Sequence, residues 1–447
     1  MAAAQILKMG LCAVLCLGAI ACGGGGGGAS SASSSSSGGV SSSSSGSTSS
    51  SSSSSGGTSS SSSSSGGTSS GSSGGTTGNV ASVIVDQGPS NQSVNTLFVS
   101  VTVCMPGSTT SCQTIDHIQV DSGSYGLRLV APPLTLTLPV ETLANGSSLA
   151  ECTQFADGFS WGPIVTADVQ IAGEQAHSVP VQVIGDSRFT SIPTNCSSAG
   201  GTSEDTVSTF GANGILGIGP FELDCGDCDI HSEGLYYACT GSTCTDTTVP
   251  ANLQVPNPVT RFAVDNNGTI IVLPAVPAAG ALTVSGSLIF GIDTQTNNVS
   301  GTQTVLTVDG NANLSISADG TTFASSFIDS GSNGVFFKDS NIANCTAPAN
   351  DPSSQITEFY CPATPLTLGV VIEGQNMVMT NNLTFTVGNA QTMLNANSTF
   401  NAFPQLSGTF PMPGTFDYGL PFFYGRRVAV AVEGAITTAG TGPYVAF

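Results

Sequence analysis

An Asp-Ser-Gly-Ser stretch occurs twice in the chain and constrains the fold more than any other feature. The first copy lies in residues 120–127 and the second in residues 328–335, so Asp121 and Asp329 fall in opposite halves of the 447-residue sequence. Each copy is an apolar run that ends in a carboxylate and continues into a small, hydroxyl-rich turn. Local duplication of one loop cannot separate two copies so widely. The pattern therefore predicts two similar lobes that each contribute one aspartate.

A single Asp-Ser-Gly is an ordinary turn sequence, because Asp and Ser bond their own backbone and Gly allows positive φ. Two copies favour a paired site. Two carboxyl groups about 3 Å apart cannot both ionise, so the pair keeps one shared proton and can act as both acid and base. Asp121 and Asp329 are the candidate catalytic pair, and this chemistry needs no metal or cofactor. Gly123 and Gly331 let backbone amides approach the carboxylates closely.

The first 22 residues are typical of an export signal, with Lys8 followed by an apolar run that is too short to span a bilayer. Ala19-Ile20-Ala21-Cys22 resembles a bacterial lipobox, with Ala19 at the usual leucine position. Cys22 would then be lipidated and would anchor the protein to a membrane, and an ordinary secretory peptide is the alternative. Gly23 is not the aspartate associated with inner-membrane retention. By analogy we expect an outer-membrane anchor, with the domain in the periplasm or on the cell surface.

Residues 23–78 are almost wholly Gly, Ser and Thr, which cannot bury enough apolar surface to offset the entropy of ordering. We expect a disordered tether that spans roughly 40 Å. The remainder is long enough for an N-terminal β lobe at 79–250 and a C-terminal β lobe at 251–447.

Beyond the tether, short runs of Val, Ile, Thr and Phe alternate with turn residues. No long stretch has a helical period, and the chain contains 56 Gly and 23 Pro, which together predict a mainly β protein. Expected strands include residues 97–103, 115–120, 134–138, 164–171 and 179–184.

The net charge of −21 and only seven Lys and Arg make nucleic acid and anionic lipid poor partners. Ten cysteines lie beyond Cys22, an even number that suits disulfides in an oxidising compartment. Cys104 with Cys112 and Cys345 with Cys361 are natural local pairs. The spacing leaves open the order of the others, which are Cys152, Cys196, Cys225, Cys228, Cys239 and Cys244. The last four could instead bind zinc, although export favours disulfides.

Residues 211–220, which read Gly-Ala-Asn-Gly-Ile-Leu-Gly-Ile-Gly-Pro, add a third motif between the two aspartates. With it, the chain from about residue 95 to its end resembles the pepsin-like aspartic proteases. That family has an Asp-Thr/Ser-Gly in each lobe and a Gly-Ile-Leu-Gly-like segment late in the first. The resemblance implies a bilobal fold with a cleft between two β lobes. It also implies an endopeptidase that cleaves extended peptides or unfolded proteins with water activated by Asp121 and Asp329.

The resemblance also assigns roles to neighbouring residues. Ser122 and Ser330 would reach across to the opposite loop, whereas Ser124 and Ser332 would each bond the aspartate of their own lobe. Other residues would support the first loop or form the flap over the cleft. The loop-support residues are Ile215, Leu216 and Gly217; the flap residues are Phe155, Gly158 and Trp161, in a hairpin at residues 155–162 with a return strand at residues 168–171.

Three positions depart from the family pattern. Phe155 replaces the flap tyrosine, Arg128 stands where many members have tryptophan, and Asp417-Tyr418 replaces an apolar pair before the last motif glycine. A catalytically inactive relative that serves as a binding or surface-structural module is therefore the alternative function. The whole chain also resembles an uncharacterised domain-of-unknown-function family of bacterial exported lipoproteins, numbered 3443, which implies no activity.

A serine hydrolase is a further enzyme class to weigh, since the chain is rich in serine. Neither aspartate motif contains a Gly-x-Ser-x-Gly elbow. His117, His177 and His231 lie in strand-like or cysteine-rich surroundings and are interpreted as structural or surface residues.

Overall fold

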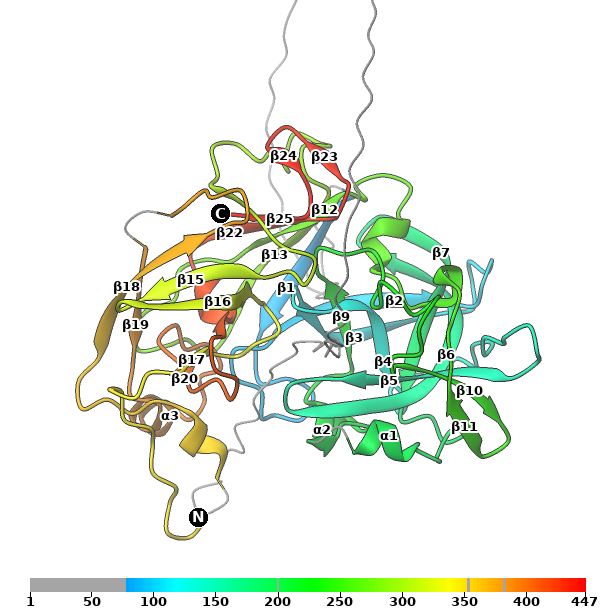
Figure 1. The fold of residues 1–447 in the computed structure, drawn as a ribbon, viewed down its shortest axis with the longest axis horizontal. Helices are drawn as coiled ribbons and strands as arrows, with labels where there is room; N and C mark the ends of the chain where they lie inside the picture. Colours follow the sequence, from blue (N-terminus) through cyan, green and yellow to red (C-terminus); the bar gives the residue numbers. More distant parts are fainter. Residues whose placement is uncertain (1–77, 199–200, 352–353, 381–382) are drawn as a thin grey trace, which may run out of the picture. The chain divides into compact units, whose positions relative to one another are not determined.

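The structure is a computed structural model that describes residues 78–198, 201–351, 354–380 and 383–447. The expected export signal, Cys22 and residues 23–77 of the expected tether lie outside the described residues. The described residues belong to one structural unit, which is mainly β and built from barrel-like sheets (Figure 1). The expected boundary between residues 250 and 251 falls inside this unit.

A sixteen-stranded sheet within the described ranges takes strands from both halves of the sequence. In spatial order its strands are β11 (Thr243–Asp246), β10 (Tyr236–Thr240), β5 (Ser148–Gln154), β6 (Gly158–Ile171), β7 (Glu174–Ile184), β4 (Tyr125–Val130), β9 (Gly214–Ile218), β3 (Cys112–Asp121), β2 (Leu97–Cys104), β1 (Val80–Val85), β13 (Val284–Phe290), β12 (Gly268–Val272), β22 (Arg427–Ala431), β25 (Tyr444–Ala446) and β14 (Val305–Thr307), with β8 (Thr202–Ser203) beside β6. Strand β1 joins the halves, because it pairs antiparallel with β2 on one edge and with β13 on the other.

A second sheet, with seven described strands, comes from the second half alone. Its spatial order is β19 (Leu383–Val387), β18 (Leu366–Glu373), β15 (Leu314–Ala318), β16 (Thr321–Ile328), β21 (Phe416–Tyr418), β17 (Val335–Phe337) and β20 (Ser407–Gly408). The remaining elements are short: β23 (Ile436–Thr437), β24 (Gly440–Thr441), α1 (Thr194–Ser197), α2 (Val207–Phe210), α3 (Ala390–Ala396) and the 3-10 turns η1 (Ala251–Leu253), η2 (Pro258–Arg261), η3 (Gln355–Glu358) and η4 (Leu420–Phe422). In the part of the chain that the structure describes, no helix is long and apolar enough to cross a membrane.

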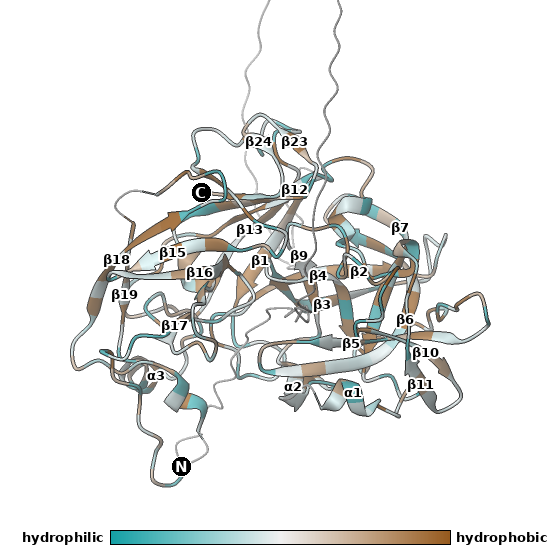
Figure 2. Ribbon diagram, in the orientation of Figure 1, coloured by the Kyte–Doolittle hydropathy of each residue, from teal (hydrophilic) through white to brown (hydrophobic). Residues whose placement is uncertain are grey.

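The strands follow the two-residue side-chain period of a sheet with one buried face. In β2, Val99, Val101 and Val103 are buried whereas Ser100 is exposed. Figure 2 shows brown apolar segments on strands throughout the fold, alternating with paler and teal ones. The largest apolar cluster includes both Val120 and Ile328, so one continuous core lies behind both aspartate stretches.

Four of the five expected strands are confirmed, as parts of β2, β3, β6 and β7. The strand expected at residues 134–138 is wrong, because this segment is irregular. The side chain of Gln113 satisfies its backbone: the amide donates to Pro133 O at 2.6 Å, and the amide oxygen accepts from Thr135 N at 2.7 Å. Prolines on both sides of the segment cannot donate to a neighbouring strand.

Five disulfides link the ten cysteines that follow Cys22. The two expected local pairs, Cys104–Cys112 and Cys345–Cys361, are both formed. The order that the spacing left open is Cys152–Cys196, Cys225–Cys228 and Cys239–Cys244. The four cysteines considered for zinc are thus paired with each other.

Candidate active site

The two aspartates occupy equivalent positions in two copies of one strand arrangement. In the first, β3 ends at Asp121 and the chain returns as β4, with β9 between them, parallel to β3 and antiparallel to β4. In the second, β16 ends directly before Asp329 and the chain returns as β17, with β21 parallel to β16 and antiparallel to β17. The topology alone therefore relates the two loops as the repeated motif predicted.

The proposed support residues lie beside the first loop. In the parallel pairing of β3 with β9, Val120 lies opposite Leu216 and Asp121 lies opposite Gly217. Ile215 and Leu216 are fully buried. A Cβ atom at Gly217 would lie 2.5 Å from Tyr125 N, so only glycine lets β9 approach the loop this closely.

The carboxyl groups of Asp121 and Asp329 face each other and are close enough for each to shift the pKa of the other. The loop glycines show how closely the loops approach. A Cβ atom at Gly123 would lie 2.7 Å from Cγ of Asp329, and one at Gly331 would lie 2.7 Å from Cγ of Asp121. Each loop thus places a glycine against the aspartate of the other.

Matching donors hold each carboxyl within its own loop. Gly123 N donates to Oδ1 of Asp121 at 2.7 Å, and the hydroxyl of Ser124 donates to Oδ2 of the same residue. In the second loop, Gly331 N donates to Oδ1 of Asp329 at 2.7 Å and the Ser332 hydroxyl lies 3.1 Å from Oδ2.

Ser122 and Ser330 tie the two loops together. Ser330 N donates to the Ser122 hydroxyl at 2.9 Å, and this hydroxyl donates to Ile328 O at 3.2 Å. In return, Ser122 N donates to the Ser330 hydroxyl at 3.1 Å, and that hydroxyl donates to Val120 O at 2.9 Å. The four bonds are buried and are related by the symmetry of the two loops.

Burial governs the electrostatics of the aspartate pair. Burial, and after it the charge of Asp329, raises the pKa of Asp121 well above the ordinary aspartate value. Burial also raises the pKa of Asp329, while hydrogen bonds from Asp121, Gly331 and Ser332 lower it again. Both effects favour a single proton shared by the pair at a pH where an isolated aspartate would be ionised.

A third buried carboxyl, Asp417, lies behind the second loop and was not among the predicted site residues. Its Oδ2 is hydrogen-bonded to the hydroxyl of Ser332. Asp417 lies opposite Phe327 in the pairing of β16 with β21, as Ile215 lies opposite Gln119 in the pairing of β3 with β9. The sequence shows the departure from an apolar residue at 417, but only the strand register shows which loop it reaches.

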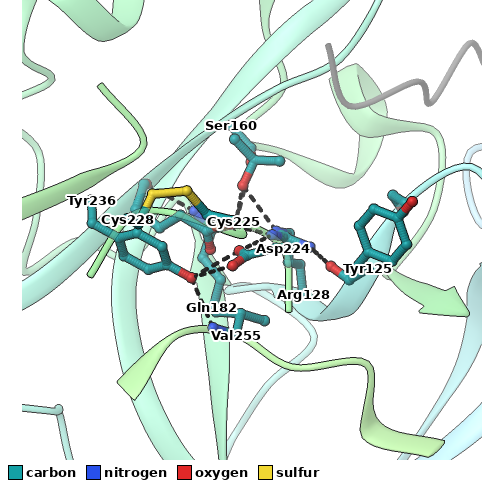
Figure 3. A network of polar contacts seen from close by, with 12 residues as sticks. Tyr125, Arg128, Ser160, Gln182, Asp224, Cys225, Cys228, Tyr236 and Val255 are labelled. Carbon is teal, nitrogen blue, oxygen red and sulfur yellow. Dashed lines mark hydrogen bonds and ion pairs between the residues drawn. A yellow bond between two sulfur atoms is a disulfide. The ribbon is translucent and has the colours of Figure 1, made fainter. Parts of the chain in front are cut away.

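Arg128 forms a buried ion network next to the first loop (Figure 3). Its Nη2 atom bonds to Glu151 and lies 2.9 Å from Oδ2 of Asp224, and its Nη1 atom donates to Tyr125 O, directly after the loop. Burial alone would lower the pKa of Arg128, but the charges of Glu151 and Asp224 more than offset it and raise the pKa. Tyr236 donates to Asp224 at 2.7 Å.

The hairpin expected as a flap is present, formed by β5 and β6 with its turn at residues 155–157. Phe155 is buried against Phe210, with ring centroids 5.8 Å apart. Trp161 is buried against Tyr237 at 5.3 Å. Gly158 is also buried, at the start of β6. Residues 168–171, expected as the return strand, lie in β6, the second strand of this hairpin.

The carboxyl groups of the pair are closed off from solvent. Asp121 and Asp329 are both 0% exposed. Two pockets of about 290 Å³ each, one beside Tyr418 and Phe422 and the other beside Leu134 and Val165, lie on the described part of the chain away from the aspartates. Gly123 is partly exposed, so it marks the side from which the pair is most nearly reached.

No curated protein matches the sequence of this chain. The model of the family described as protein of unknown function (DUF3443) matches residues 75–447. This range contains both aspartate loops, Asp417 and the Arg128 network, and it covers most of the chain. The chain therefore belongs to the DUF3443 family.

Proposed function

We propose that this protein is an aspartic endopeptidase with a bilobal pepsin-like fold, in which Asp121 and Asp329 activate water. The observation that carries the proposal is the set of reciprocal contacts between the two equivalent loops. The two carboxyl groups face each other at close range, and each loop glycine lies against the opposite aspartate. The substrates would be extended peptides or unfolded proteins, and a lipid on Cys22 would hold the enzyme at the outer membrane.

The proposed reaction uses one proton shared by the pair. The ionised carboxylate takes a proton from water, and the water oxygen attacks the peptide carbonyl carbon. The protonated carboxyl gives its proton to the carbonyl oxygen, so a tetrahedral diol forms. When the C–N bond breaks, the leaving nitrogen takes a proton from the aspartate pair, and one of the two diol hydroxyl groups gives a proton back to the pair. The products are a carboxylic acid and an amine, and the pair again holds one proton.

Two features of the pair support this chemistry. Burial and mutual repulsion raise the pKa of Asp121, which keeps one acid available where free carboxyl groups would be ionised. The tie through Ser122 and Ser330 fixes the separation of the carboxyl groups without using the carboxyl oxygens. The acid and base are therefore positioned before substrate arrives.

A non-enzymatic peptide-binding or surface-structural module on the same fold is the second candidate. The observation that favours it is the closure of the site: both carboxyl groups are fully buried, and Phe155, which lacks a phenol, is packed against Phe210. In the enzyme, the segments that cover the pair would have to open for substrate. In a binding module they need not do so.

The test is cleavage of a reduced, carboxymethylated protein by the full chain across about pH 3–7, with and without pepstatin. We expect pepstatin-sensitive cleavage that is lost in Asp121→Asn and in Asp329→Asn, while circular dichroism shows both variants folded. Lack of cleavage by folded wild-type protein would reject the enzyme. Saturable binding of the same unfolded protein without turnover would then establish the binding module.

A further inference from the structure

The hydroxyl of Ser332 lies between two buried carboxyl groups. Its Oγ atom is 3.1 Å from Oδ2 of Asp329 and is also hydrogen-bonded to Oδ2 of Asp417. Both aspartates are 0% exposed. Ser332 thereby links Asp417 to Asp329, which faces Asp121, so the three carboxyl groups form one buried network.

The number of protons limits the hydrogen-bonding arrangements that this network can adopt. A serine hydroxyl has one proton and can donate it to only one of the two carboxyl groups. If Ser332 donates to Asp329, the contact between Ser332 and Asp417 requires a proton on Asp417. If Ser332 donates to Asp417 instead, Asp329 loses a donor and Asp417 can be an anion.

The surroundings of Asp417 disfavour the anion. Its partners in the neighbouring strands are Phe327 of β16 and Phe336 of β17. Among the described residues its Oδ1 has no hydrogen-bond partner, and no Lys, Arg or His forms an ion pair with it. An ionised carboxylate buried without a cationic partner costs several kcal/mol.

The titratable groups that face Asp417 act in the same direction. Asp329 lies beyond Ser332, and Asp121 lies beyond Asp329. Burial, and after it the charge of Asp329, raises the pKa of Asp417 well above its ordinary value, while the hydrogen bond from Ser332 lowers it. Arg426 interacts with Tyr418, the next residue in β21, and not with Asp417.

The first loop has no such third carboxyl. The position equivalent to Asp417 is Ile215, which packs in an apolar cluster with Phe155 and Phe210. Ser124 donates to Asp121, its own aspartate. The two halves of the pair are therefore supported unequally, although their strands and loops are alike.

We infer that Asp417 is a protonated positioning residue: its O–H donates to Ser332 and thereby directs the Ser332 proton to Asp329. Asp329 is then the ionised member of the pair, and Asp121 carries the shared proton. Ionisation of Asp417 turns the Ser332 proton away from Asp329 and adds a second negative charge beside the pair. The residue thus couples the catalytic pair to pH. This role in catalysis rests on the proposed peptidase function.

The test compares Asp417→Asn with Asp417→Leu in the full chain. Asparagine keeps an uncharged donor for Ser332, whereas leucine has about the same size but no donor. We expect kcat of the Asn variant to stay within about twofold of wild type and kcat of the Leu variant to fall at least about tenfold, with KM little changed. A purely space-filling role would leave the Leu variant active. Equal losses in both variants, or no loss in either, would overturn the inference.

A second measurement does not depend on turnover. Infrared difference spectra of wild type against Asp417→Asn at pH 7 should show the carbonyl band of one protonated carboxyl group in wild type only. Absence of this band would refute a neutral Asp417 even if the protein cleaves peptides. Its presence in a protein that cleaves nothing would retain the protonated Asp417 and reject the peptidase.

Discussion

Ser122 and Ser330 exchange hydrogen bonds across the two aspartate loops, with each hydroxyl accepting from the backbone N–H of the other serine, at 2.9 and 3.1 Å. Each hydroxyl also donates to a backbone carbonyl of the strand that leads into the opposite loop: Ser122 to Ile328 O and Ser330 to Val120 O. The hydroxyl groups of Ser122 and Ser330 therefore hold the backbones of the two loops together, and the loop backbones set the positions of the carboxyl groups. Because this tie does not involve the carboxyl oxygens, it also holds the two loops together at a pH where both carboxyl groups ionise and repel each other.

Removing either hydroxyl should destabilise the protein by similar amounts. Ser122→Ala leaves Ser330 N without its acceptor, and Ser330→Ala does the same to Ser122 N, each inside the fold. A buried unsatisfied donor costs about 1–3 kcal/mol. Urea unfolding should show a loss of this size for both variants and almost none for Ser82→Ala, whose side chain is exposed on β1. A change at Ser122 no larger than that at Ser82 would refute the tie.

A methyl group added at the loop glycines should force the two carboxyl groups apart. The new Cβ would lie 2.7 Å from Cγ of Asp329 in Gly123→Ala, and 2.7 Å from Cγ of Asp121 in Gly331→Ala. We expect loss of peptide cleavage and a destabilisation of about 1–3 kcal/mol in each variant, measured by turnover and by urea unfolding. Gly369→Ala is the matched control, since nothing lies within 4 Å of its added Cβ. Cleavage by both loop variants at the rate of this control would contradict the close approach.

The sequence was sufficient to locate the two loops because their signals are local. An apolar run, an aspartate, a hydroxyl and a glycine each act within a few residues, and the second copy supplies the partner. The same holds for the Cys104–Cys112 pair, whose residues face each other across β2 and β3.

Features that depend on distant partners could not be predicted. Arg128 bonds to Glu151 and Asp224, which are 23 and 96 residues away, and no spacing rule joins them. The contact between Asp417 and Ser332 depends on the register of β21 against β16. The segment at 134–138 has the composition of a strand, yet the Gln113 side chain takes the bonds that a neighbouring strand would have made.

Asp224 should make the protein less stable as the pH rises. Burial, and after it the charge of Glu151, raises the pKa of Asp224 well above its ordinary value. An aspartate whose pKa is higher in the folded than in the unfolded protein contributes its full stabilisation at a pH below about 3.9, its pKa in the unfolded chain. This contribution to the free energy of unfolding is lost as the pH rises through the pKa of the folded state. In that window the free energy of unfolding should fall by up to ~1.4 kcal/mol per pH unit for this one proton.

Asp224→Asn should remove this part of the pH dependence, because the amide stays neutral at every pH. Urea unfolding measured at intervals from mild acid to weakly alkaline solution gives the slope for each variant. Asp319→Asn, at an exposed turn, should keep the wild-type slope. Equal slopes in wild type and Asp224→Asn would show that the Arg128 network holds no extra proton.

The Cys152–Cys196 disulfide should stabilise the protein more than Cys239–Cys244. The first closes a loop with a sequence separation of 44 residues and the second one of 5. Restricting the unfolded chain is worth about 4 kcal/mol for the longer loop and about 2 kcal/mol for the shorter one. Replacing each pair with two alanines and measuring urea unfolding without reductant should give losses in this order. The shorter loop joins neighbouring strands whose register already holds Cys239 opposite Cys244, so its removal leaves the strand pairing intact. A larger loss for the shorter loop would mean that packing around the sulfur atoms, and not the entropy of the unfolded chain, determines what these bonds contribute.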